Sequence, residues 1–148
     1  MNSQQQERPV AAKRHHYDFF EVITLRYADN DANGHVNNAH YYSFFDTAIE
    51  GYLRQRKLRE ILAGSISTPV VASSCRYFHE VAFPGEISLG VRVTRIGTTS
   101  ITYDIAVFAD DNDTASAQGT FTTVTTDRQT KRPIPVPQAF RDQHPQLL

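Results

Sequence analysis

The segment from Asp29 to His40 reads DNDANGHVNNAH and gathers acidic, imidazole and amide side chains around one glycine. A carboxylate in such a segment can act as a general base or as a nucleophile towards a carbonyl carbon. Asp31 lies seven residues before Asn38, and a turn at Gly34 would fold its carboxylate back towards a helix that starts there. A helix start stabilises an oxygen that becomes negative, because it presents unpaired N–H groups and the positive end of the helix dipole. The structural alternative is that Asp31 only accepts hydrogen bonds from loop amides.

The same segment contains the first half of a calcium-binding EF-hand loop, DNDANG. A complete EF-hand loop needs a helix on both sides and a bidentate glutamate at its twelfth position. Counted from Asp29, the twelfth residue is His40, and a strand is expected before the loop, so calcium is disfavoured. A transition-metal site built from Asp29, Asp31, His35 and His40 is disfavoured too, because polar surface loops often collect such residues.

Two elements are expected to position this segment. Asp18 to Tyr27 is rich in β-branched and aromatic residues and predicts a strand that runs into it. From Ala39 to about Lys57 the pattern predicts a long helix. The apolar positions of that helix recur at helical spacing; they are Tyr41, Phe44, Phe45, Ala48, Ile49 and Tyr52.

The predicted helix also decides how the Asn33-Gly34 pair is interpreted. Asn-Gly is typical of a hairpin turn between two strands, but here the second strand is missing. A tight turn remains, in which Gly34 takes a positive φ and delivers the chain to the helix. Asn37 or Asn38 is then the expected helix cap, because an asparagine oxygen accepts from N–H groups two or three residues further on.

Four later stretches alternate or run apolar between turn signals and predict strands at 69–81, 86–96, 100–109 and 114–126. The FPGE, GTT and DDND turns between them are too short for crossover helices, so neighbouring strands are expected to be antiparallel. Together these elements predict an α+β fold in which an antiparallel sheet of about five strands curls around one helix.

The two ends of the chain are expected to lie outside that sheet. Residues 1–16 are polar and predict a flexible N-terminal arm. The tail 131–148 contains four prolines, which cannot continue a sheet, so we expect it on the surface. The whole chain of 148 residues is expected to form a single domain.

Composition excludes several classes of function. Fifteen basic and 16 acidic residues give a formal charge of −1, so no global field favours nucleic acid or an anionic membrane. The single Cys75 excludes an internal disulfide and is expected to be a small core residue. No apolar run approaches the length of a membrane span, so we expect a soluble, cytoplasmic protein.

The stretch LRYADNDANGHVNNAHYYSFFDTA resembles the signature of hot-dog fold acyl-CoA thioesterases of the 4-hydroxybenzoyl-CoA thioesterase type. That signature has an apolar residue, an arginine and an aromatic residue, then Asp-x-x-Gly-His-Val-Asn-Asn and an aromatic-rich helix. The expected order of helix and strands also fits that family across nearly the whole chain. The resemblance implies hydrolysis of a small-molecule acyl-CoA with no metal or redox cofactor, by a homodimer or homotetramer.

By that resemblance Asp31 is the catalytic carboxylate, acting as general base or nucleophile. The backbone N–H of Asn38 is the donor that polarises the thioester carbonyl. His35 and Asn37 match positions of the motif that shape the loop, with His35 counted in the catalytic set and Asn37 in the substrate-binding set. The chain departs from the motif at Asn30, where a small or hydroxyl residue is commoner.

A second branch of the family uses an acid on the helix, and Asp46 or Glu50 would play that part here. The loop around Asp31 fits the first branch better. Acyl groups in the family lie against variable residues of the helix, which makes Tyr41, Tyr42 and Phe45 candidate substrate-binding residues. An aromatic residue at helical spacing is, however, more often plain core.

Coenzyme A carries phosphates, which a nearly neutral protein must bind with individual side chains. Family members bind the nucleotide at the edge of a subunit interface, with contacts from central strands and their turns. The candidate CoA-binding residues by that resemblance are Arg76, Arg95, Thr98, Thr99 and Ser100.

Two rival functions share this fold. Hot-dog hydratases and dehydratases are associated with an Asp-x-Asn-Pro-x-His spacing, whereas Asp31 to His35 is one residue shorter and contains no proline. A non-catalytic module that binds acyl thioesters stays open, because binding and hydrolysis use the same pocket. A serine hydrolase is disfavoured, because no Gly-x-Ser-x-Gly motif is present.

Overall fold

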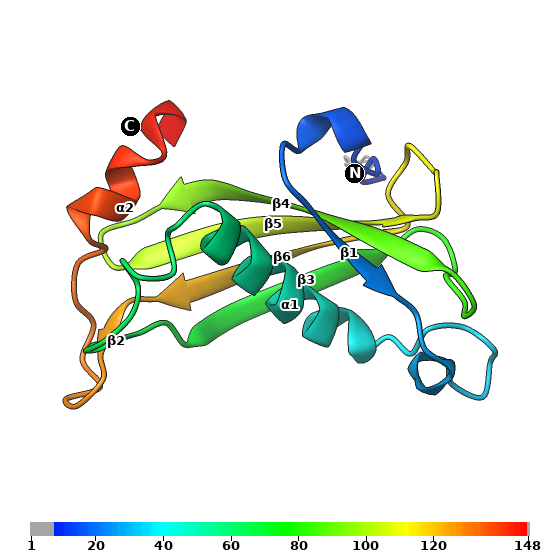
Figure 1. The fold of residues 1–148 in the computed structure, drawn as a ribbon, viewed down its shortest axis with the longest axis horizontal. Coiled ribbons are helices and arrows are strands. Elements are labelled where there is room, and N and C mark those ends of the chain that lie inside the picture. Colours follow the sequence, from blue (N-terminus) through cyan, green and yellow to red (C-terminus); the bar gives the residue numbers. More distant parts are fainter. Residues whose placement is uncertain (1–7, 148) are drawn as a thin grey trace, which may run out of the picture.

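The computed structural model describes residues 8–147, in which an antiparallel five-stranded sheet wraps around one long helix (Figure 1). The strands of this sheet are β1 (Phe20–Thr24), β3 (Val70–Tyr77), β4 (Glu86–Ile96), β5 (Ser100–Ala109) and β6 (Ala117–Val124). Their order across the sheet is β1-β4-β5-β6-β3. Two short strands, β2 (Ile66–Ser67) and β7 (Thr126–Asp127), pair separately. The predicted α+β fold is confirmed.

The long helix is α1 (His40–Gln55), which crosses the concave face of the sheet (Figure 1). A second, short helix is α2 (Gln138–Asp142). Single 3₁₀ turns are η1 (Arg14–His16), η2 (Tyr27–Asp29) and η3 (Pro145–Leu147). Among the residues that the structure describes, no helix is long and apolar enough to cross a membrane.

Packing of α1 on the sheet explains the apolar pattern of both. The buried side chains of the helix are the predicted stripe with one addition, Leu53; they are Tyr41, Phe44, Phe45, Ala48, Ile49, Tyr52 and Leu53. They meet the inward-facing residues of the central strands, which alternate with outward-facing ones as period-two strands require. Burial of this apolar surface is the main free-energy source that holds the helix in the sheet.

Two glycines let other groups approach closely. Gly119 on β6 faces the helix, and a Cβ there would come within 2.6 Å of Phe45 Cε2. The Phe45 ring can therefore lie directly on the sheet, where it is fully buried. Gly51 on α1 leaves room in the same way for the carboxylate of Glu21, which occupies the position that a Cβ would take.

The N-terminal segment differs from the expected flexible arm in the part that the structure describes. Lys13 forms a β-bridge with Thr114, and Ala12 is buried against the outer face of the sheet. The next aromatic residue, Tyr17, is buried as well and donates a hydrogen bond of 2.9 Å to Asp104. A polar composition did not reveal these contacts, which depend on residues about a hundred positions away. Residues 1–7 of the expected arm lie outside the described range.

The C-terminal tail also packs more closely than we expected from its prolines. Val136 and Phe140 are buried in the main core, and His144 is only 2% exposed. His144 Nε2 lies 2.9 Å from the hydroxyl of Tyr52 on α1, so the tail closes one end of the sheet. No named strand runs through the described part of this tail, although Pro133 makes an isolated β-bridge with Thr126, and the prolines leave room for a short helix with one apolar side.

Candidate functional site

The loop before α1 is a tight turn closed by its own backbone. Asp31 N donates to His35 O at 2.9 Å, and Gly34 N donates to Asp31 O at 3.0 Å. Gly34 has a φ of +79°, as its expected role requires. Glycine takes this left-handed conformation without the steric cost that a side chain would add. The turn therefore has the conformation that the sequence predicted.

The Asp31 carboxylate serves this loop with one oxygen. Its Oδ1 accepts the Asn33 N–H at 2.8 Å, which is an Asx turn and matches the structural alternative. Its other oxygen, Oδ2, has no hydrogen-bond partner within residues 8–147. The residue is half-buried. Asp31 thus supports the loop and still has one oxygen that can face a substrate or a water molecule.

Asp29 anchors the same loop from the protein interior, a role that we did not predict. Its side chain is fully buried and accepts hydrogen bonds from Arg26 N at 2.7 Å and from Arg26 Nη2 at 2.9 Å. Its backbone oxygen accepts the Asn37 N–H at 2.9 Å. Burial by itself would raise the pKa of Asp29, but the hydrogen bonds and charge of Arg26, with His40 adding to them, hold that pKa below its usual range.

The helix start is shaped by Asn37. Its side-chain Oδ1 accepts the Ala39 N–H at 2.9 Å, and its backbone oxygen accepts the His40 N–H at 2.9 Å. Regular α1 begins at His40, two residues after the expected donor. The N–H of Asn38 has no acceptor among the residues that the structure describes. It is therefore available to an oxygen from outside the chain.

A small cavity of about 210 Å³ opens beside this helix start. It brings together three predicted site residues, His35, Asn38 and Tyr41, and its other lining residues are Val36, Tyr77, Phe78, His79, Glu80 and Val81. Asp31 is not part of its wall, although the Asp31 turn closes directly on His35.

Tyr77, at the end of β3, is a residue of this cavity that sequence reasoning missed. Its hydroxyl donates to the backbone oxygen of Asn38 at 3.2 Å, and its ring meets Tyr41 edge-on at a centroid distance of 5.0 Å. His35 Nε2 lies 3.0 Å from Glu80 Oε2, which ties the loop to the segment after β3. No signal in the sequence pointed to Tyr77, because it contacts a residue 39 positions away.

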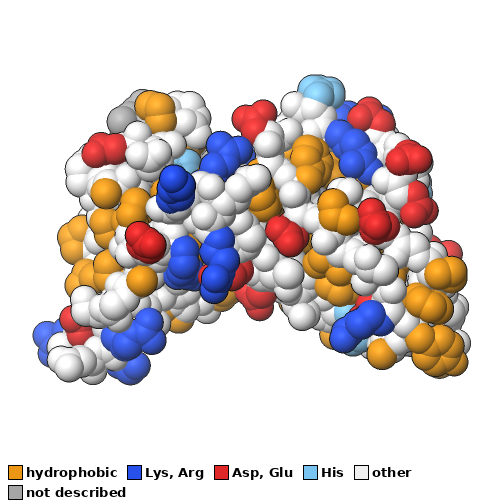
Figure 2. Space-filling model, in the orientation of Figure 1, with side chains coloured by type: hydrophobic (Ala, Val, Ile, Leu, Met, Phe, Trp, Pro, Cys, Tyr) orange, Lys and Arg blue, Asp and Glu red, His pale blue; other side chains and the backbone are white. Residues whose placement is uncertain are grey.

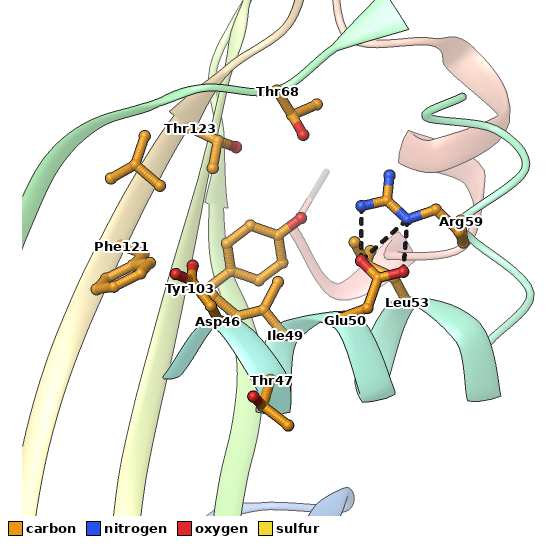
Figure 3. A pocket seen from close by; sticks show the side chains of 11 residues that line it. Asp46, Thr47, Ile49, Glu50, Leu53, Arg59, Thr68, Tyr103, Phe121 and Thr123 are labelled. Atoms are coloured by element: carbon orange, nitrogen blue, oxygen red, sulfur yellow. Dashed lines mark hydrogen bonds and ion pairs between the residues drawn. The ribbon is translucent and has the colours of Figure 1, made fainter. Parts of the chain in front are cut away.

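A larger cavity of about 500 Å³ lies further along α1, between the helix and the start of β3 (Figure 3). The two helix acids that we considered as alternatives both line it, Asp46 and Glu50. Burial raises the pKa of Asp46, which has no ion-pair partner among the described residues. Hydrogen bonds from Arg59 above all hold the pKa of Glu50 below its usual range, against its partial burial and with help from Arg54.

The other two aromatic candidates differ in their surroundings. Phe45 is completely buried, with its ring edge-on to Phe121 at 5.7 Å, and lines neither of these cavities. Its position is that of a core residue. Tyr42 is half-buried and stacks on Phe121 at 5.7 Å, and Phe121 itself lines the larger cavity. Tyr42 thus lines neither of these two cavities itself, but it supports a residue that lines the larger one.

The five candidate CoA-binding residues do not gather at one place in this chain. Arg76 pairs with Gln118 on β6, whereas Arg95 pairs with Thr102 on β5. When both positions are traced through the strand pairings to β5, Arg76 and Arg95 lie level with residues four apart on that strand, or about 13 Å along it. In the turn that we selected, the backbone oxygens of Thr98 and Thr99 accept hydrogen bonds from Val136 and Thr125.

Two further features bear on ligand binding: the charge on the protein surface and the side chains that could hold a metal ion. Acidic and basic side chains are interspersed over the face in Figure 2, so no single basic area marks a phosphate site on that face. Within residues 8–147 no three His, Cys, Asp or Glu side chains converge to hold a metal ion.

Comparison with known proteins gives a family match. Residues 25–144 match the model of the thioesterase-like superfamily. The crystal structure of PA5185 from Pseudomonas aeruginosa is 43% identical, covers 93% of this chain and 96% of its own, and superposes with a TM-score of 0.83. Slr0204 from Synechocystis, a 1,4-dihydroxy-2-naphthoyl-CoA thioesterase, is 18% identical over 84% of this chain and 93% of its own, with a TM-score of 0.75.

A curated relative is the uncharacterized protein YsmA of Bacillus subtilis. It is 28% identical over 87 residues, and this match spans 58% of our chain and 58% of YsmA. The similarity to Slr0204 reflects a common fold, while the superfamily match covers the predicted motif, the helix and the sheet.

Proposed function

The chain belongs to the thioesterase-like superfamily, and we propose that it hydrolyses an acyl-CoA thioester to a free acid and coenzyme A. The observation that carries this proposal is the N–H of Asn38, just before α1, which has no acceptor within residues 8–147 and lies beside a cavity that Tyr41 and Tyr77 also line. A thioester carbonyl oxygen that accepts from this N–H gains a hydrogen bond and the favourable end of the helix dipole as it becomes negative.

The proposed reaction uses the second oxygen of Asp31. Oδ1 stays on the Asn33 N–H and keeps the loop closed, while Oδ2 takes a proton from an attacking water or attacks the carbonyl carbon itself. The tetrahedral intermediate then collapses, the carbon–sulfur bond breaks, and coenzyme A leaves as the thiolate. On the nucleophile route a mixed anhydride with Asp31 forms first, and water hydrolyses it to release the acid.

Neighbouring residues would hold these groups in position. The Tyr77 hydroxyl holds the Asn38 backbone, and His35 with Glu80 fixes the turn that carries Asp31. Such supporting contacts matter because small displacements of a catalytic group greatly reduce its effect.

We further propose that the working unit is a homodimer formed through β3. This strand is at one edge of the sheet, and three of its apolar residues are exposed: Val70 by 45%, Val71 by 59% and Tyr77 by 47%. An unpaired edge with apolar side chains favours the addition of another strand. Two copies paired antiparallel about a two-fold axis at Ser74 would bring Val70 and Val71 of one copy next to Tyr77 of the other.

That pairing would connect the two cavities. Tyr77 lines the small cavity beside the helix start, and Val70 lines the larger one. With Tyr77 of one copy next to Val70 of the other, a thioester held at Asn38 of the first copy could extend its acyl group into the larger cavity of the second. The isologous contact repeats the arrangement on both sides of the two-fold axis.

The decisive experiment measures thiol release from a panel of aryl and fatty acyl-CoAs. We expect hydrolysis by the wild type and a loss of at least about a hundredfold in kcat/KM for Asp31→Asn, because an amide cannot act as base or nucleophile. Asp111→Asn, in the exposed β5–β6 turn, is the matched control and should keep full activity.

Three other results would contradict this proposal. Undiminished hydrolysis by Asp31→Asn would remove Asp31 from the mechanism. Binding of acyl-CoA without any thiol release would favour a binding module. Hydration of an enoyl-CoA without thiol release would favour a hydratase.

A further inference from the structure

The larger cavity combines an apolar floor with polar groups at one end (Figure 3). Ile49 and Leu53 of α1, together with Phe121 of β6, form apolar wall. At the opposite side the side chains of Thr68 and Thr123 turn their hydroxyl groups towards the open space (Figure 3). Cavities of this kind bind ligands that are mostly apolar and carry a few polar atoms at defined positions.

Tyr103 provides the most informative of these polar groups. Its side chain is 1% exposed, and its hydroxyl points into the cavity between Thr68 and Arg59 (Figure 3). That hydroxyl makes no hydrogen bond with any residue of the described chain. Because the hydroxyl faces the open space of the cavity, a polar ligand atom placed there can bond it, whereas an apolar ligand that displaces water would leave it without a partner. Burial also raises the pKa of Tyr103, so the group stays a neutral hydroxyl that can both donate and accept.

Charges around the cavity indicate what kind of partner fits. Arg59 donates to both oxygens of Glu50 and, through Nη1, to the backbone oxygen of Leu62 at 3.1 Å. Its guanidinium is therefore already engaged and is not free for a ligand carboxylate. Asp46 adds a carboxylate to the cavity wall, and it forms no ion pair with any residue of the described range. A second anion brought into this space would be repelled.

We propose that the larger cavity takes the acyl part of the substrate, and that the Tyr103 hydroxyl binds a neutral polar group, a hydroxyl or a carbonyl, at the end distant from the thioester. This inference rests on the proposed thioesterase function and specifies its substrate class. Acyl groups that end in a methyl group leave the Tyr103 hydroxyl unpaired. Acyl groups that end in a carboxylate meet Asp46 and the engaged Arg59.

The test compares three matched series of CoA thioesters, from butanoyl to decanoyl: plain acyl, ω-hydroxyacyl and ω-carboxyacyl. For at least one chain length we expect wild-type kcat/KM to be about tenfold higher for the ω-hydroxyacyl-CoA than for the plain one, and lowest for the carboxylate. Tyr103→Phe should abolish the preference for the hydroxyl group, so that the ratio of kcat/KM between the ω-hydroxyacyl and plain series falls to about one. Tyr17→Phe, the same substitution at a buried tyrosine on the other face of the sheet, should retain it.

A binding measurement separates this inference from the proposed reaction. The Asp31→Asn protein should bind ω-hydroxyacyl-CoA about tenfold more tightly than plain acyl-CoA in calorimetry, and the further change Tyr103→Phe should make the two equal. Equal affinities before that change, or a preference that survives it, would overturn the inference even if hydrolysis is normal. If the wild type does not hydrolyse any of these thioesters but the affinity difference that depends on Tyr103 is still measured, only the proposed reaction is overturned.

Discussion

Two aspartates in the loop before α1 lie two residues apart and have different surroundings. Asp29 is buried, and both of its carboxylate oxygens accept hydrogen bonds from Arg26. It therefore holds the loop and has no oxygen available for a substrate. Asp31 is half-buried, and its Oδ1 accepts the N–H of Asn33. Its Oδ2 has no partner within the described residues and is available to a substrate or a water molecule. Residue type cannot distinguish these cases, because the difference depends on how many N–H groups each carboxylate meets.

Substitution of the anchoring aspartate should therefore reduce stability. Asp29→Asn removes the charge that accepts from Arg26, and we expect a loss of about 2 kcal/mol in the free energy of unfolding at neutral pH, or about 6 °C in Tm. The folded pKa of Asp29 is lowered, so its contribution is complete above the unfolded pKa of about 4 and is lost as pH falls through the lower folded value. Melting curves at neutral pH and near pH 3 should show the difference between the variants narrowing; a constant difference would contradict this assignment.

At the scale of elements, the site depends on how α1 lies on the sheet. Asn38 lies two residues before the helix, whose middle turns line the larger cavity. Beneath the helix, β6 has Gly119 where Phe45 must approach. Any change that lifts the helix displaces the donor N–H and both cavity walls together. The geometry of the site therefore depends on the close packing of Phe45 on Gly119, which sets the position of α1 on the sheet.

Gly119→Ala tests this packing. The added Cβ would clash with the Phe45 ring and with the backbone oxygen of Ser74, and a backbone atom cannot move aside cheaply. We expect a loss of about 2–3 kcal/mol in the free energy of unfolding, measured by urea denaturation. Thr120→Ser, at the next residue of β6 and exposed on the other face, keeps the hydroxyl that meets Ser74 Oγ at 2.8 Å and should change it by less than about 0.5 kcal/mol. Equal effects of the two substitutions would show that the close contact is unimportant.

At the scale of the whole molecule, one edge of the sheet is left open. β1 and β3 are the two edge strands, and β3 combines exposed apolar residues with a half-buried Cys75 that faces the helix side. The sheet of one chain thus covers α1 without completing the wall of the larger cavity beside Val70. A second copy on β3 would complete that wall and pair the free backbone groups of the edge.

Val71→Arg should separate the proposed dimer. In the proposed pairing Val71 lies next to Tyr77 of the second copy, so the substitution places an unpaired charge in an apolar contact. By light scattering we expect twice 16.7 kDa for the wild type and 16.7 kDa for the variant, with reduced thioester hydrolysis. Val22→Arg, at an exposed position of the other edge strand, should remain dimeric. Dissociation by Val22→Arg alone would assign the interface to β1.

The sequence by itself determined the elements and the loop. Strand and helix periods, the antiparallel order and the positive φ of Gly34 depend on residues close in the chain, whose spacing restricts the backbone directly. The family motif added Asp31 and Asn38 as candidates, and their catalytic roles stay predictions.

Only the tertiary structure decided which side chains meet. Tyr77 reaches Asn38 across 39 residues, and His144 reaches Tyr52 across 92. Tyr103 reads as an ordinary inward-facing strand residue, and its open hydroxyl is visible only once α1 and β3 surround it. The physical reason is that such contacts depend on strand register and on the packing of α1 over the sheet, which many distant apolar contacts set together and no local spacing records.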